Sequence, residues 1–136
     1  MPTRDEILSA NKRYASAFEK GGLPREPARR FAVVTCMDAR LDPARFLGLE
    51  EGDAHVIRNA GGVVSDEVLR ALAVSHEQLG TQEALVIGHR DCAVIADAVE
   101  HVRAGVDTIR STPLLPDSFT ATGFVYDVET GRIEPV

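Results

Sequence analysis

The chain has 136 residues, of which 15 are Lys or Arg and 21 are Asp or Glu, so its formal net charge is −6. Because a nucleic-acid-binding protein neutralises phosphates with a basic stripe, this acidic balance argues against a nucleic-acid partner. Hydrophobic residues make up 44% and charged residues 26% of the chain, as in a folded soluble domain. The sequence lacks an apolar run of the roughly 20 residues that a membrane span needs. We therefore expect a single domain over residues 1–136 without a membrane partner.

The first 27 residues predict a helical arm followed by a linker. Thr3 and Glu6 have the spacing of a capping box, and apolar residues then recur with a helical period, which predicts a helix over residues 3–20. Residues 1–30 carry 7 basic and 4 acidic side chains, against 8 and 17 in the remainder. A basic arm can dock on an acidic partner subunit, but a solvated helix face fits this pattern equally well.

After the arm, short apolar runs alternate with helical patterns. The runs are rich in β-branched residues and lack polar alternation, as in strands buried on both faces of a sheet. This order predicts an α/β domain with a central, mostly parallel sheet of about four to five strands flanked by helices. The predicted strands cover residues 31–36, 54–58, 83–88 and 121–127; the predicted helices cover 66–79, after the N-cap Ser65, and 97–110, with an apolar stripe that starts at Ile95.

The sequence contains two cysteines, Cys36 and Cys92. Its N-terminus lacks the apolar core of a secretory signal, so we expect a cytoplasmic protein. In a reducing compartment such a pair is more often buried, catalytic or metal-bound than joined in a disulfide.

A group of potential metal ligands follows two of the predicted strands. Cys36 ends the first strand, with Asp38 two residues later, and His89 and Cys92 come just after the third strand. Sites in parallel sheets form beyond the carboxyl ends of strands, where these side chains can meet. Two sulfurs, an imidazole and an oxygen suit tetrahedral zinc. Two buried cysteines that act as small hydrophobes, beside a hydrogen-bonded histidine, fit the spacing about as well.

Three motifs together resemble the β-class carbonic anhydrases. They are the Cys-x-Asp-x-Arg element at residues 36–40, the segment Arg-Asn-Ala-Gly at 58–61 and the His-x-x-Cys element at 89–92. The chain is most similar to the short microbial branch of that family. The resemblance implies one zinc per chain, bound by Cys36, His89 and Cys92. It also implies a catalytic dyad of Asp38 and Arg40, and a substrate-binding segment of Asn59, Ala60 and Gly61.

The activity implied by this resemblance is the reversible hydration of carbon dioxide to bicarbonate and a proton by zinc-bound hydroxide. Asp38 would ligate zinc only in a closed state, and Arg40 would free the fourth position by pairing with Asp38. Because two thiolates cancel the charge of the metal, we expect an activity that rises above neutral pH. Members of the family are dimers or multiples of dimers, so the resemblance also implies a homodimer or such a multiple.

The sequence departs from the family pattern in two places. Ala93 stands where members usually have glycine after the second zinc cysteine, and the helical insertion that usually follows is missing between Cys92 and the next helix. These departures keep two alternatives open. One is a non-catalytic zinc-binding homologue with a structural or interaction role. The other is a hydrolase of a related small molecule, carbon disulfide or carbonyl sulfide, on the same fold.

The remaining histidines do not fit the predicted ligand set. His55 lies in the second strand, where it could act as a proton shuttle or be buried and hydrogen-bonded. His76 falls on the apolar stripe of one predicted helix and His101 on the polar side of the next. We therefore expect His76 and His101 to be structural or solvated.

Overall fold

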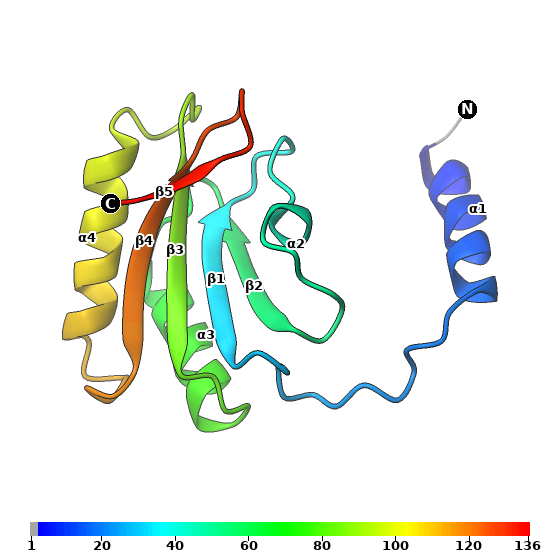
Figure 1. Cartoon of the computed structure of the whole chain (residues 1–136), viewed down its shortest axis with the longest axis horizontal. Helices are drawn as coiled ribbons and strands as arrows, with labels where there is room; N and C mark the ends of the chain where they lie inside the picture. Colours follow the sequence, from blue (N-terminus) through cyan, green and yellow to red (C-terminus); the bar gives the residue numbers. More distant parts are fainter. Residues whose placement is uncertain (1–2) are drawn as a thin grey trace.

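The strands of the chain pair into one sheet, and the computed structural model describes residues 3–136. The strands are β1 (Phe31–Cys36), β2 (Ala54–Asn59), β3 (Glu83–His89), β4 (Thr120–Tyr126) and β5 (Ile133–Pro135), and the helices are α1 (Thr3–Ser16), α2 (Pro43–Phe46), α3 (Asp66–Glu77) and α4 (Ala98–Ser111). The sheet has the order β2-β1-β3-β4-β5, in which only β5 runs antiparallel to its neighbour (Figure 1). The predicted mostly parallel α/β fold is confirmed.

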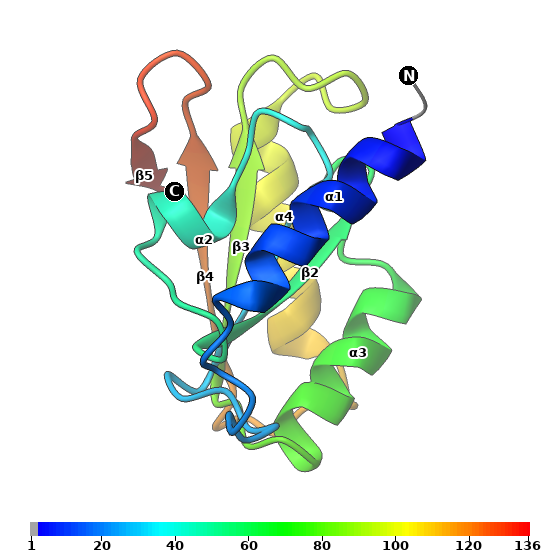
Figure 2. The ribbon, with the colours of Figure 1, turned by 90° about the vertical axis from the view of Figure 1, so that its right-hand side faces the viewer.

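Helices cover the two faces of the sheet unequally. The long helices α3 and α4 pack on one face, while the other face carries only the short helix α2 (Figure 1; Figure 2). In β1, Val34 belongs to the core under α3 and α4, and Val33 belongs to the smaller core beside α2. All six residues of β1 are buried. Its position between two strands and two cores explains why its sequence is apolar without alternation.

Most predicted element boundaries agree with the structure within about two residues, but α4 starts later than its apolar stripe. The helix begins at Ala98 because Asp97 is its N-cap, and the Asp97 carboxylate accepts a hydrogen bond from the Glu100 N–H at 3.1 Å. Ile95 therefore lies outside the helix, although its spacing continues the stripe. The predicted strand at 121–127 begins at Thr120 and is followed by the short strand β5, which completes the sheet.

Helix α4 packs against the sheet at two glycines. A Cβ atom built on Gly123 of β4 would lie 2.5 Å from Val102 Cγ1, and one on Gly88 of β3 would lie 2.6 Å from Val102 Cγ2. Because real Cβ atoms cannot approach so closely, only glycine permits this contact. The close packing places the first turns of α4 beside the carboxyl end of β3.

Helix α1 stands apart from the sheet on an extended linker (Figure 1). None of its 14 residues is buried. It ends at Ser16 and not at residue 20 as predicted. The Ser16 hydroxyl donates to the Arg13 carbonyl at 2.8 Å, and the Ala17 N–H bonds to the Tyr14 carbonyl three residues back, so the last turn tightens and the helix stops.

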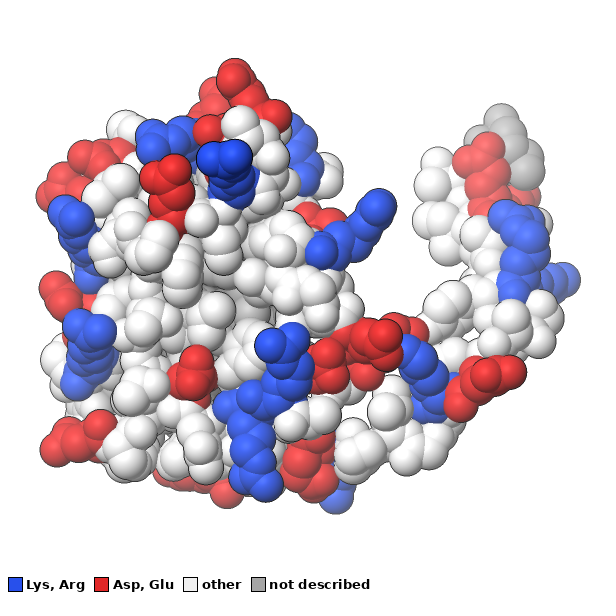
Figure 3. All heavy atoms as spheres, viewed as in Figure 1, with Lys and Arg blue, Asp and Glu red and all other residues white. Residues whose placement is uncertain are grey.

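Charged side chains of both signs are spread over the face of the body shown in Figure 3, with no continuous stripe of either sign on that face. None of the helices in residues 3–136 has the length and the apolar character needed to cross a membrane.

Candidate metal centre

The pairing of β1 with β3 brings the predicted ligands together. After β1 the chain forms β2 on one side of β1 and then returns to form β3 on the other side, so the strand order reverses between β1 and β3. Cys36 is the last residue of β1 and His89 the last of β3. One ligand atom from each of Cys36, His89 and Cys92 lies within 4.8 Å of the others. Both cysteines are free thiols, so the sulfurs are not joined in a disulfide.

The His89 ring is oriented for metal binding. Its Nδ1 lies 2.8 Å from the Arg90 carbonyl oxygen, which can only accept a hydrogen bond, so Nδ1 carries the proton and Nε2 has the lone pair. Nε2 is buried and has no hydrogen-bond partner within residues 3–136. An unpaired buried nitrogen is costly unless it binds a metal or another donor. This atom and two sulfurs match the donor set of a zinc site with an open fourth position.

Asp38 lies at the edge of this cluster and is paired with Arg40. Arg40 donates from Nε to Asp38 Oδ1 at 3.0 Å and from Nη2 to Oδ2 at 2.7 Å, and its backbone N–H donates to Oδ1 at 2.8 Å. These hydrogen bonds hold the pKa of Asp38 far below its ordinary value and raise the pKa of Arg40. Asp38 Oδ2 is 3.8 Å from His89 Nε2. The carboxylate is therefore ionised and adjacent to the ligand cluster.

Two further residues, Asp91 and Arg58, stabilise the loops that carry the ligands, although neither belongs to the predicted site. Arg40 also donates from Nη1 to Asp91 Oδ2 at 3.0 Å and from Nη2 to the Asp91 carbonyl at 2.9 Å, which joins the loop after β1 to the loop after β3. Asp91 adopts a φ of 56°, which a non-glycine residue rarely does. Arg58 donates to the carbonyls of Cys36, Asp38 and Leu41. Asp91 lies between the predicted ligands His89 and Cys92, and Arg58 is the first residue of the Arg-Asn-Ala-Gly segment, so the position of each in the sequence already indicates a place near the site.

The segment after β2 lies beside Cys36. The Gly61 N–H donates to Cys36 Sγ at 3.3 Å. A Cβ on Gly62 would fall 3.0 Å from the Thr35 carbonyl carbon, so the segment approaches β1 as closely as glycine permits. The Asn59 side chain bonds both backbone polar groups of Val63, at 2.9 and 2.7 Å, and so stabilises its own turn.

The histidines outside the ligand set are hydrogen-bonded to the protein. His55 Nδ1 lies 2.6 Å from Ser75 Oγ, and His76 Nδ1 lies 2.6 Å from the Thr81 carbonyl. His101 Nε2 lies 2.9 Å from the Gly61 carbonyl, and its side chain is partly buried rather than solvated. The helical pattern alone could not show this contact, because Gly61 is 40 residues away in the sequence.

The link from Cys92 to α4 consists of residues 93–97 and contains no helix. Ala93 does not adopt a positive φ, since the two non-glycine residues of the described chain that do are Arg30 and Asp91. A methyl group in place of hydrogen is therefore tolerated at Ala93 without backbone strain. Val94 in this link is 60% exposed, so an apolar side chain faces solvent close to the ligand cluster.

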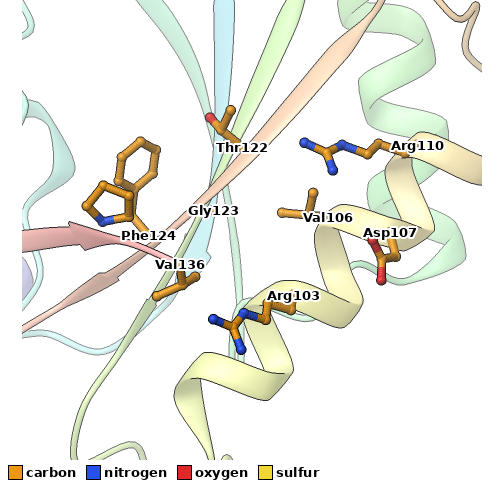
Figure 4. Close-up of a pocket in the computed structure, with 9 residues that line it drawn as sticks. Arg103, Val106, Asp107, Arg110, Thr122, Gly123, Phe124 and Val136 are labelled. Atoms are coloured by element: carbon orange, nitrogen blue, oxygen red, sulfur yellow. The ribbon is translucent and has the colours of Figure 1, made fainter.

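A separate groove of about 400 Å³ lies between α4 and β4. Figure 4 shows Arg103 and Arg110 of α4 on one side of it, with Gly123 and Phe124 of β4 and Val136 on the other. None of the predicted site residues lines this groove. The groove and the ligand cluster are thus separate places in the fold.

Known proteins share this architecture over their whole length. A family model described as carbonic anhydrase matches residues 31–111. The β-carbonic anhydrase 1 of Mycobacterium tuberculosis is 41% identical over 162 positions, which cover 100% of this chain and 99% of that protein. A carbon disulfide hydrolase of Acidianus sp. is 28% identical and covers 95% of this chain and 86% of its own length. A crystal structure of carbonic anhydrase from Streptococcus mutans has a TM-score of 0.96 at 37% identity, and the match covers 100% of this chain and 98% of that one.

The parallel sheet and the cysteine–histidine cluster at its strand ends define an α/β protein with a zinc-type ligand set. The chain belongs to the carbonic anhydrase family, in its β class. The resemblance found in the three motifs is confirmed. The alignment with the mycobacterial relative has 162 positions and this chain has 136 residues, so about 26 aligned positions have no residue here. The chain is therefore shorter than this relative, as the sequence predicts, and the location of the missing segment after Cys92 stays a prediction.

We predict that His55→Asn leaves hydration activity within about twofold of the wild type. His55 is paired with Ala32, four residues before the Cys36 end of β1, and is therefore about 13 Å along the strands from the ligand cluster. Stopped-flow assays will measure the activity. A loss of tenfold or more that imidazole buffer restores would contradict this prediction and indicate a proton shuttle.

The same variant tests the titration of His55. Burial lowers its pKa from 6.5 because the charged ring loses hydration. As the pH falls through about 6.5 the unfolded chain binds the proton first, so the free energy of unfolding is constant above that pH and declines below it. Urea unfolding between pH 5 and 8 will show a weaker decline in His55→Asn.

Proposed function

We propose that this protein is a zinc-dependent carbonic anhydrase that converts carbon dioxide and water reversibly to bicarbonate and a proton. The observation that carries the proposal is the cluster of Cys36, His89 and Cys92, with its unpaired buried nitrogen, in a chain 41% identical over its full length to a β-carbonic anhydrase. Free thiols favour a reducing compartment, so we propose that the enzyme acts in the cytoplasm.

The chain supplies three ligands for the metal. The two sulfurs and His89 Nε2 would hold zinc, while the hydrogen bond from His89 Nδ1 to the Arg90 carbonyl fixes the ring orientation. Zinc bound there would supply a Lewis acid that lowers the pKa of water and so makes water a better nucleophile. Cys36 is buried and Cys92 partly buried, so bulk water is largely excluded around the sulfurs.

Asp38 and Arg40 control the space beside the ligands. Arg40 holds both carboxylate oxygens of Asp38 and so prevents Asp38 from becoming a fourth ligand, which would be the closed state. The ionised Asp38 can accept a hydrogen bond from the reacting water and orient it toward carbon dioxide. Asn59, Ala60 and Gly61 form the wall next to Cys36, and we assign them to the substrate side of the site.

We predict that wild-type protein purified with zinc contains one zinc per chain and hydrates carbon dioxide, and that Cys92→Ser loses both properties. Loss of a thiolate also removes the folding free energy that the metal supplies, so the variant should melt at a lower temperature. Zinc will be measured by mass spectrometry and hydration by stopped flow at two pH values. Ser16→Ala, an exposed site far from the cluster, is the control.

The same assays separate the alternatives. Bound zinc without hydration would identify a non-catalytic homologue. Because a carbon disulfide hydrolase of Acidianus sp. is 28% identical to this chain, sulfide release from carbon disulfide will be measured in parallel. Sulfide release with no hydration would replace the proposed substrate by carbon disulfide.

We predict that Arg40→Ala keeps its zinc but loses hydration activity by about 10–100-fold, the usual effect of removing a partner of the metal ligands. Without the guanidinium, Asp38 is free to take the fourth position. Arg70→Ala is a matched control, since Arg70 forms an exposed ion pair with Glu67 on α3. Full activity in Arg40→Ala would refute the gating role.

We also propose that the chain forms a homodimer, or a multiple of dimers, through α1. Ile7 is 60% and Tyr14 55% exposed, although both lie on the apolar side of α1. A hollow of about 270 Å³ lies between β2 and α3, lined by apolar residues that include Val56 and Val74. The segment of residues 1–30 is basic and the rest of the chain is acidic. Helix α1 itself carries three basic and two acidic side chains, so the match that supports docking is between its exposed apolar side and the apolar hollow of a second copy.

A variant with Ile7→Glu and Tyr14→Glu is predicted to be monomeric, while Ser9→Glu with Ser16→Glu, on the opposite side of α1, remains dimeric. Both variants add two negative charges, so only the position differs. Sedimentation or light scattering at micromolar concentration will give the mass. A wild-type monomer, or equal masses for the two variants, would contradict docking of α1 on a second copy.

A further inference from the structure

The backbone of Gly61 connects helix α4 to a zinc ligand. Its N–H donates to Cys36 Sγ at 3.3 Å, and its carbonyl accepts a hydrogen bond from His101 Nε2 at 2.9 Å. Because a carbonyl oxygen only accepts, His101 Nε2 carries the proton and acts as the donor. We propose that His101 is a positioning residue of the metal centre, which holds the Gly61 backbone so that its N–H stays bonded to the Cys36 sulfur. This inference rests on the zinc site proposed above.

Gly61 needs such support because a residue without a side chain does not restrict its own backbone conformation. It adopts a φ of +87°, a conformation that L side chains rarely adopt. A Cβ there would lie 2.9 Å from Val94 Cγ2 and 3.1 Å from Ile95 Cγ1, so the link after Cys92 packs directly over it. A glycine without a side chain keeps its torsional freedom unless other groups restrain it. Gly61 is restrained by the turn that Asn59 closes through Val63, by this apolar cover and by the hydrogen bond from His101, which is the side-chain donor to its carbonyl.

The position of His101 on the first turn of α4 makes this contact possible. Only five residues separate Cys92 from Ala98, so the helix begins beside the ligands. His101, His89 and Cys92 border one small void, which is too small to hold a water molecule. In the intact protein no water from this void competes with His101 for the Gly61 carbonyl, and truncation of His101 would remove that donor.

The N–H···S hydrogen bond affects how the sulfur binds a metal. A donor aimed at a thiolate withdraws electron density from the sulfur, so the sulfur donates less to the metal and the metal keeps more positive charge. His101 does not touch the Cys36 sulfur. It acts indirectly, because it holds the Gly61 backbone whose N–H bonds to that sulfur. The expected consequences are a preorganised Cys36 and a distinct sulfur-to-metal charge-transfer energy.

The experiment compares His101→Ala with His101→Gln, whose side-chain amide can still donate near the position of Nε2. We expect His101→Ala to bind zinc about 10–100-fold more weakly, as measured by chelator competition, because outer partners of metal ligands have effects of that size. In the cobalt-substituted protein its sulfur-to-cobalt absorption band should move to longer wavelength, since the sulfur regains electron density. His101→Gln should stay close to the wild type in both measurements.

Arg103→Ala is the matched control, because Arg103 lies on the same helix and faces the groove between α4 and β4 (Figure 4). It should keep wild-type affinity and band position. Wild-type values in His101→Ala would overturn the inference, and so would equal losses in His101→Ala and His101→Gln, because the ring and not the donor would then matter. If the wild-type protein binds neither zinc nor cobalt, the proposed zinc site fails first, and this result is distinct from the others.

Discussion

The parallel pairing of β1 with β3 is the constraint on which the site depends. It places the last residues of both strands, Cys36 and His89, at one edge of the sheet, at the point where the strand order reverses. β1 can occupy this central place because its six residues are buried on both faces. The ligand cluster is therefore a consequence of core packing. A core substitution that shifts β1 relative to β3 would separate Cys36 from His89 without replacing either residue.

Hydrogen bonds to backbone carbonyls and carboxylates then orient the side chains and loops that the sheet brings together. Arg58 stabilises the loop after β1 through three carbonyls, and Arg40 joins that loop to Asp91 in the loop after β3. His89 presents Nε2 because Nδ1 is bonded to Arg90. Cys36 and His89 are thus held by polar groups of the chain outside the ligand cluster, the Gly61 N–H and the Arg90 carbonyl, as metal centres require for a fixed geometry.

The link after Cys92 is short, with only five residues before α4 begins at Ala98. It leaves Val94 exposed and brings α4 close enough for His101 to reach Gly61. An insertion in this link would separate Cys92 from α4, so the support that we propose from His101 depends on the shortness of the link.

The sequence by itself determined four of the five strands, the long helices, the types of the candidate ligands and the family, because these follow from local periodicity and from the spacing of chemically distinct residues. It did not determine the short elements α2 and β5, the partners of Asp91 and Arg58 or the burial of His101. Those depend on contacts between residues up to 51 positions apart, such as Arg40 with Asp91, and on side-chain hydrogen bonds that have no period along the chain. Only the tertiary structure, which sets these distances, decided them.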